Sequence, residues 1–471
     1  MNVNVTKKDI LSGYIAQFFQ YGTGVIVLPV ILNRLSSAEI GMNYVMLSVG
    51  ALANMADFGF SGQIGRNITY VLSGAQKIYR GEVEPIQGSN KTDYKLLRTI
   101  IDASRFLYAR ISLVVFFILL TFGSIYMNHV TKGFTNVENS LIIWILYSVG
   151  VFFNIYFLYY NSFLTGSGQI YEQRVATILS RGTYIIICLG LVLNGGGLMS
   201  VVLANLISPF VARYYSYKKF YSKELKEYLS VFQTDKKEVL SAIKDIWFTA
   251  KKSGTNTIGH YIGTQGSTFL AGAFLPLVTV GQWGIMTQLF GIVQSLAANM
   301  GLSYYPEYCK YRILGEKEAF LKKSSLSVAL MSLMIIVGGS FIILLGPYIL
   351  TLIDSNATLP SITIMFVYLI YILVLTNAQL FATMMSSRNV IPSPSAVVAT
   401  SIGQIIFTIV LLGVFNLDIW GLLLGPFIAG GIYTFWAWVK NELNDLNISW
   451  LTYLKIGFRE LYLIVKNKVI K

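Results

Sequence analysis

The chain has 471 residues, of which 54% are hydrophobic and only 12% are charged, and its mean hydropathy is +0.60. This composition excludes a soluble globular protein, whose surface would need many more charged residues. The formal net charge of +14 could suit a nucleic-acid-binding protein, but the lysines and arginines lie between apolar segments, so we expect membrane topology and no nucleic-acid partner.

Apolar segments long enough to cross ~30 Å of hydrocarbon as a helix of about 20 residues recur along the chain. Twelve are predicted, at residues 11–32, 39–60, 106–128, 139–162, 175–193, 197–217, 254–276, 283–303, 326–350, 359–383, 395–415 and 419–440. No cleavage site follows the first, so we expect it to be retained. The sequence therefore predicts an all-α polytopic membrane protein.

Basic residues gather on one side of the predicted membrane. All but four of the 36 lysines and arginines lie in the N-terminal segment, the C-terminal tail or alternate connections such as 61–105 and 213–252. The exceptions are Arg34, Arg110, Lys132 and Arg181. By the positive-inside rule, both termini are expected in the cytoplasm.

The second half of the chain repeats short segments of the first. The matching pairs are Leu28–Pro29 with Leu275–Pro276, Ala53–Met55 with Ala298–Met300, and Pro209–Ala212 with Pro426–Ala429. Two pseudo-symmetric six-helix halves around a central cavity are therefore predicted, at residues 1–217 and 254–440. A basic cytoplasmic linker (218–253) joins them, and a basic amphipathic cytoplasmic tail (441–471) follows.

Motifs of enzyme chemistry are missing from the sequence. There is no phosphate-binding loop, metal-ligand spacing or pair of catalytic carboxylates, and His129 and His260 are far apart. Cys188 and Cys309 do not suggest a disulfide framework. We therefore expect neither an enzyme nor a cofactor.

Polar groups within the apolar segments are the candidate site residues, because they are costly at membrane depth. Arg181 lies about six residues, or ~9 Å, into the fifth segment. Its guanidinium either reaches the cytoplasmic headgroups or faces a cavity, where it could bind a phosphate or a sugar carboxylate. Asn161 adds a polar group to the same hydrophilic interior.

Four further residues are candidates for coupling or gating. Asp57, near the cytoplasmic end of the second segment, either pairs with a local cation such as Arg66 or carries a proton. Asn54 and Asn299 occupy matching repeat positions and either line the cavity or bond across helices. His260 could titrate near neutral pH, although a structural histidine is the more common outcome.

The segment LPVILNRLSSAEIG from Leu28, followed by a small-residue span ending in DFGFSGQIGR, resembles the Wzx-type O-antigen and polysaccharide repeat-unit flippases. These belong to the multidrug/oligosaccharidyl-lipid/polysaccharide (MOP) exporter superfamily. The resemblance implies alternating-access transport of an undecaprenyl-pyrophosphate-linked oligosaccharide. It further implies contact with membrane lipids and with polymerase and chain-length proteins of lipopolysaccharide biosynthesis. Arg181, Arg174 and Arg66 would attract the anionic headgroup, and Asp57 would be the coupling residue.

Two alternatives stay open at the level of the sequence. One is an exporter of a drug or of another lipid-linked precursor, although a cation-drug exporter would need acidic groups in its cavity. The other is a membrane polysaccharide polymerase, which generally needs a large outward loop, whereas every predicted outward connection is short.

Overall fold

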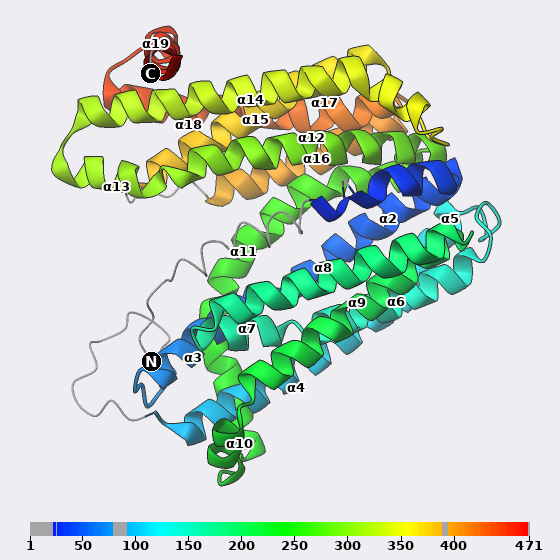
Figure 1. Cartoon of the computed structure of the whole chain (residues 1–471), viewed down its shortest axis with the longest axis vertical. Helices are drawn as coiled ribbons and strands as arrows, with labels where there is room; N and C mark the ends of the chain where they lie inside the picture. The colour runs from blue at the N-terminus through cyan, green and yellow to red at the C-terminus, as the bar shows by residue number, and fades with distance from the viewer. Residues whose placement is uncertain (1–21, 25, 79–91, 389–393, 470–471) are drawn as a thin grey trace. The chain divides into compact units, whose positions relative to one another are not determined.

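The computed structural model describes residues 22–24, 26–78, 92–388 and 394–469, and their regular structure is helical. The chain divides into two compact units, Met1–Tyr261 (unit 1) and Ile262–Lys471 (unit 2). Within each unit the long helices run alongside one another (Figure 1). Most of the first predicted segment, 11–32, lies outside the described residues.

Unit 1 contains the helices up to the middle of α11. They are α2 (Ser37–Asn54), the 3-10 turn η1 (Met55–Asp57), α3 (Phe60–Leu72), α4 (Tyr94–Ile118), the π-helical turn η2 (Leu119–Gly123), α5 (Ser124–Val130), α6 (Ser140–Tyr156), α7 (Tyr159–Gly166), α8 (Ile170–Leu193), α9 (Gly197–Phe220), α10 (Lys223–Ser230) and α11 (Lys236–Phe274). Residues 218–253, expected to link the halves, form the end of α9, α10 and the first part of α11.

Unit 2 contains the end of α11 and eight further helices. They are α12 (Leu277–Ser303), α13 (Tyr305–Leu314), α14 (Lys317–Leu352), α15 (Ile362–Ser386), α16 (Pro394–Gly413), α17 (Ile419–Ile432), α18 (Thr434–Leu446) and α19 (Trp450–Val469).

Eight helical segments within the described residues are long and apolar enough to cross a membrane. They begin at Tyr94, Ser140, Ile170, Gly197, Lys317, Ile362, Ser395 and Ile419. The other four predicted spans fall on the helical residues between 22 and 34, on α2, on the end of α11 and on α12. The prediction of an all-α polytopic membrane protein is confirmed.

The repeat seen in the sequence extends to the order of the helices. A short helix follows α2 and α12 alike, as α3 and α13, and a long helix follows each of these, as α4 and α14. Neighbouring helices also pack in the same pairs, α8 with α9 in unit 1 and α16 with α17 in unit 2. Pro209 and Pro426, which match in the sequence, both lie inside their helices, α9 and α17.

The second span, predicted as one continuous helix at 39–60, is interrupted in the structure. Phe58 and Gly59 have φ angles of 48° and 78°, in the left-handed region, so the helical chain ends at η1 and restarts as α3. A left-handed non-glycine residue is costly and needs support from its surroundings. The Phe58 ring has that support, because it stacks on Trp247 of α11 with centroids 5.1 Å apart.

A capping box fixes the start of α2 and ties it to α9. The Ser36 hydroxyl accepts from the Glu39 amide at 3.2 Å, and the Glu39 carboxylate accepts from the Ser36 amide at 2.8 Å. The second oxygen of Glu39 accepts from the Leu198 amide at 2.8 Å, in the first turn of α9. One carboxylate thus stabilises two helix N-termini.

Gly50 lets α2 approach α6 closely. A Cβ at this position would lie 2.1 Å from the Tyr147 hydroxyl, which itself donates to the Met46 carbonyl at 2.5 Å. Because any side chain would displace that hydroxyl, this contact requires glycine.

A buried ion network holds three elements of unit 2 together. Arg312 of α13 pairs with Glu442 and, at 2.6 Å, with Asp445, both on α18. Arg388, just after α15, contacts the same two carboxylates at 2.9 Å each. The Glu442 side chain has no exposed surface, so its charge depends on both guanidinium groups.

The substitution Gly50→Ala should destabilise the protein by about 1–3 kcal/mol, because the added methyl group overpacks the contact with Tyr147. The thermal unfolding midpoint of purified protein measures the effect. Gly62→Ala is the matched control, because nothing lies within 4 Å of a Cβ there. Adding Tyr147→Phe to Gly50→Ala should recover part of the loss, and equal midpoints for the two single variants would contradict the close contact.

The substitution Glu442→Ala should lower the free energy of unfolding by about 3 kcal/mol, because it leaves two largely buried guanidinium groups with Asp445 as their remaining carboxylate. Glu318→Ala is the control, because the Lys322–Glu318 pair has exposed fractions of 53% and 84% and should contribute no more than about 0.5 kcal/mol. Chemical denaturation in a fixed detergent compares the two. Similar losses would show that the network adds little.

Candidate functional site

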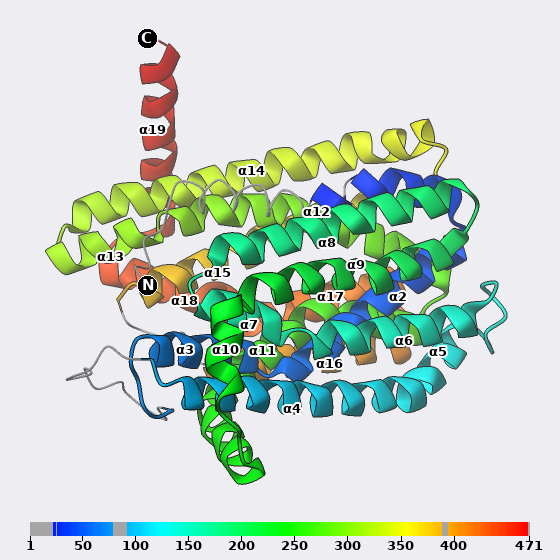
Figure 2. The same ribbon diagram turned by 60° about the horizontal axis from the view of Figure 1, so that its bottom comes forward.

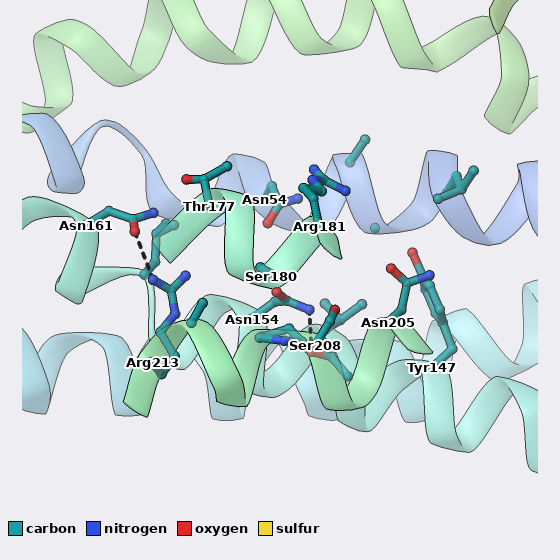
Figure 3. Close-up of a pocket in the computed structure, with 18 of the residues that line it drawn as sticks. Asn54, Tyr147, Asn154, Asn161, Thr177, Ser180, Arg181, Asn205, Ser208 and Arg213 are labelled. Atoms are coloured by element: carbon teal, nitrogen blue, oxygen red, sulfur yellow. Dashed lines mark hydrogen bonds between the residues drawn. The ribbon is translucent and has the colours of Figure 1, made fainter. Parts of the chain in front are cut away.

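A cavity of about 430 Å³ lies inside unit 1 (Figure 3). Its walls come from one face each of α2, α6, α7, α8 and α9. The lining residues that carry polar side chains are Asn54, Tyr147, Asn154, Asn161, Thr177, Ser180, Arg181, Asn205, Ser208 and Arg213. The volume lies in the range of about 300–1,000 Å³ that is usual for small-molecule sites.

Arg213 and Asn161 form a hydrogen bond across the cavity wall. Nη1 of Arg213, on α9, donates to Oδ1 of Asn161, on α7, at 2.8 Å (Figure 3). Nε of Arg213 is buried and has no hydrogen-bond partner in the described part of the chain. Since a guanidinium carries five N–H donors, this arginine keeps donors for an anionic ligand.

Arg181 is the second cation of the cavity and comes from α8. Its guanidinium group forms no hydrogen bond or ion pair with any residue that the structure describes. Thr177 and Ser180 lie within one turn of it and line the same wall. Figure 3 places Asn54, at the end of α2, beside Arg181 in that view. Of the two arrangements left open by the sequence, the structure has Arg181 on the cavity wall.

Amide side chains supply most of the remaining polar surface. Asn154 donates to the Gly150 carbonyl of its own helix at 3.0 Å, which leaves its side-chain oxygen able to accept. The side-chain amides of Asn54 and Asn205 make no hydrogen bond with the residues that the structure describes. Such groups can bond the hydroxyl groups of a sugar as donors or as acceptors.

The charge of the cavity is positive. Two arginines line it, and no aspartate or glutamate is among its lining residues. The arginines therefore have no carboxylate in the cavity to neutralise them, and at low effective dielectric constant the cavity attracts anions.

Three predicted site residues, Arg181, Asn161 and Asn54, come together in this cavity. Two other predicted arginines do not line it. Arg174 lies on α8, nearer its start, and Arg66 lies on α3, where it donates to Gln63 and sits 6.0 Å from the centre of the Tyr70 ring.

Asp57 is held by hydroxyl groups. Tyr108 donates to one of its carboxylate oxygens, and the Ser61 hydroxyl donates to the other at 2.8 Å. Asp57 and Arg66 do not form an ion pair in the structure, so the pairing expected from the sequence is wrong. The carboxylate fixes the break between α2 and α3, where Phe58 has its left-handed conformation.

The two remaining candidates lie elsewhere. Asn299 is on α12 of unit 2, and a gating role shared with Asn54 stays a prediction. His260 is on α11, and its side chain lies outside the described residues.

Arg213 and Asn205 line the cavity but were not predicted as site residues from the sequence. Arg213 was grouped with the basic connection 213–252, although α9 continues to Phe220. The signal was present as helical spacing, since Asn205, Ser208 and Arg213 recur on one face of α9 and Tyr147, Gly150 and Asn154 on one face of α6.

The ratio of the rate with an anionic methanethiosulfonate reagent to the rate with a cationic one should be higher for a cysteine at position 177 than for a cysteine outside the cavity. An arginine roughly 10 Å away contributes on the order of 1.5 kcal/mol at an effective dielectric constant near 20. Arg213→Gln should therefore lower the ratio of the two rates about tenfold or more. The native cysteines should not react, because Cys309 is replaced by serine in all variants and Cys188 is buried. Asn194→Cys, outside the cavity, is the control, and an unchanged ratio at position 177 would contradict a cationic cavity.

Comparison with known proteins gives a result for the fold. No family model matches the sequence, and no curated protein matches it. Among solved structures, an inward-facing multidrug resistance MATE family transporter of the MOP superfamily matches with a TM-score of 0.62 and 13% identity, over 94% of this chain and 99% of that one. The lipid II flippase MurJ, in an inward closed conformation, matches with a TM-score of 0.64 and 14% identity, over 98% and 93%. The chain has the fold of MOP-superfamily transporters.

Proposed function

We propose that the protein is a flippase that moves an undecaprenyl-pyrophosphate-linked oligosaccharide, such as an O-antigen repeat unit, across the bacterial inner membrane by alternating access. The observation that carries the proposal is the cavity of unit 1, which has two arginines and no carboxylate. Its position among apolar helices of a transporter fold suits a cargo with an anionic head and an apolar tail.

The pyrophosphate would bind near the two arginines. A guanidinium can donate two parallel N–H bonds to a phosphate, and the donors of Arg213 that Asn161 does not occupy are available for this contact. Arg181, without an ion-pair partner in the described chain, would contribute a second charge.

The sugars would bind to the amide and hydroxyl groups of the cavity. Asn54, Asn154 and Asn205 offer donors and acceptors that match sugar hydroxyl groups. A volume of about 430 Å³ holds only part of an oligosaccharide head. The polyprenyl chain would stay in the surrounding lipid, whose interior is as apolar as the chain itself.

Export of another lipid-linked precursor, or of a drug, is the alternative. The lipid II flippase MurJ and the multidrug transporter match the fold about equally well, so the choice between these cargoes rests on the charge of the cavity. A cationic drug would be repelled by Arg181 and Arg213, because like charges at low dielectric constant raise the binding free energy. Polymerase and chain-length proteins of the same pathway would act on the product.

Deleting the gene identifies the cargo. The intermediate that accumulates on the cytoplasmic side should be an undecaprenyl-pyrophosphate-linked oligosaccharide, detected by mass spectrometry of extracted lipids. Accumulation of lipid II would select the alternative cargo, and the absence of any accumulated lipid-linked intermediate would overturn the proposal.

Charge reversal at Arg181 should lower surface polysaccharide at least about tenfold, which corresponds to about 1.4 kcal/mol of lost interaction, because a carboxylate would repel the pyrophosphate. The measurement is polymer on whole cells, with protein level followed by immunoblot. Arg110→Glu is the control, since Arg110 lies outside the cavity with its guanidinium 4.7 Å from the centre of the Phe106 ring. Full polymer with Arg181→Glu would remove Arg181 from the site.

A further inference from the structure

The last helix, α19, crosses the other helices of unit 2. It points toward the viewer in Figure 1 and stands upright in Figure 2, whereas α14, against which it packs, lies along the picture in both. It is not among the eight segments that are long and apolar enough to span a membrane. Because α14 is long and apolar enough to span a membrane, a helix that crosses it at a steep angle would run along the membrane surface.

The residues between α18 and α19 produce this change of direction. Asn447 has a φ angle of 52° and ends α18 in the left-handed conformation that asparagine tolerates. Two residues later, the Ser449 hydroxyl accepts from the Thr452 amide at 3.3 Å and starts the new helix.

A buried face attaches α19 to the bundle. The Tyr453 side chain is fully buried, with its hydroxyl 3.8 Å from the Met384 sulfur and its ring 5.5 Å from that of Phe381. At Gly457, a Cβ would lie 2.3 Å from the Ser325 carbonyl oxygen of α14, so the two helices touch at this point. The helix therefore has one defined orientation on unit 2.

A second face of α19 is apolar and exposed. Leu451, Phe458 and Tyr462 recur at intervals of seven and four residues, so they form one stripe, and their exposed fractions are 71%, 47% and 64%. Lys455, Arg459 and Lys466 are exposed and form a parallel basic stripe beside it. This pairing of an apolar and a basic stripe is typical of helices that lie in a membrane interface.

The end of unit 2 that carries α19 is also its basic end. Lys310 and Lys317 lie near the junction of α13 and α14, and Lys440 lies on α18, which leads into α19. By contrast, residues 353–361, at the opposite end of α14, contain no lysine or arginine. The positive-inside rule assigns the basic end to the cytoplasmic leaflet.

We propose that α19 binds anionic phospholipid of the cytoplasmic leaflet. The stripe of Leu451, Phe458 and Tyr462 enters the boundary between headgroups and acyl chains, and Lys455 and Arg459 contact the phosphate groups. Each basic residue near an anionic surface strengthens binding, and the effect falls with salt. The proposal does not depend on which cargo the protein carries.

Full-length protein in nanodiscs tests the insertion. Phe458→Cys, in the Cys309→Ser background, carries an environment-sensitive fluorophore, and Thr452→Cys is the matched control. Thr452 is exposed and lies about 120° around the helix from position 458. In discs that contain phosphatidylglycerol, a quencher attached to the lipid acyl chain should quench the label at 458 several-fold more than the label at 452. Equal quenching at both positions would overturn the proposal.

Lipid titration tests the charge. Phosphatidylglycerol added to the detergent-solubilised protein should raise the thermal unfolding midpoint, whereas phosphatidylcholine should not. Lys455→Glu with Arg459→Glu should raise the apparent Kd for phosphatidylglycerol at least about tenfold, and a matched pair at the exposed lysines of α10, Lys223→Glu with Lys226→Glu, should leave it unchanged. An equal response to both lipids would overturn the proposal. So would quenching that appears only when two protein copies share a disc, because that result would assign the stripe to self-association.

Discussion

The cost of an unpaired polar group among apolar helices governs this structure. In lipid or in a helix core, a donor or acceptor without a partner costs several kcal/mol, so most buried hydroxyl groups bond to their own helix. Ser48, Ser104 and Ser148 donate to carbonyls three or four residues earlier at 2.7–2.9 Å. Polar groups that do not close such bonds are therefore exceptional, and in unit 1 several of them gather around one cavity.

The same constraint explains what the sequence could predict. Apolar length and the placement of basic residues identify spans, and the fold class followed from them, because both depend on the membrane alone. The break at Phe58 and Gly59 could not be predicted, since it depends on the stacking of Phe58 on Trp247, which lies far along the chain. Local composition around Asp57 gave no sign that Tyr108 would supply its hydrogen bond.

The candidate site was predictable in part for a related reason. Arg181 was identified because an arginine deep in a span is conspicuous by itself. Arg213 was missed because it lies next to the many basic residues of the connection 213–252, and only its hydrogen bond to Asn161 of another helix distinguishes it from them. Residues of this kind belong to a site because several helices turn polar faces toward the same cavity. Polar residues at helical spacing therefore identify them better than the depth of a single residue along one span.

The two units share an order of helices but use their charges differently. In unit 2, Arg312 and Arg388 are each paired with Glu442 and Asp445, so these guanidinium groups stabilise the packing of α13 and the end of α15 against α18. In unit 1, Arg181 and Arg213 face a cavity that no carboxylate lines. Two carboxylates offset the positive charge of a guanidinium bonded to them, so it attracts a phosphate only weakly. A neutral amide does not offset that charge, so the attraction for a phosphate is retained. Although the repeat gives both units a similar order of helices, the described residues leave positive charge unpaired in the cavity of unit 1, and the proposed binding of an anionic headgroup rests on that charge.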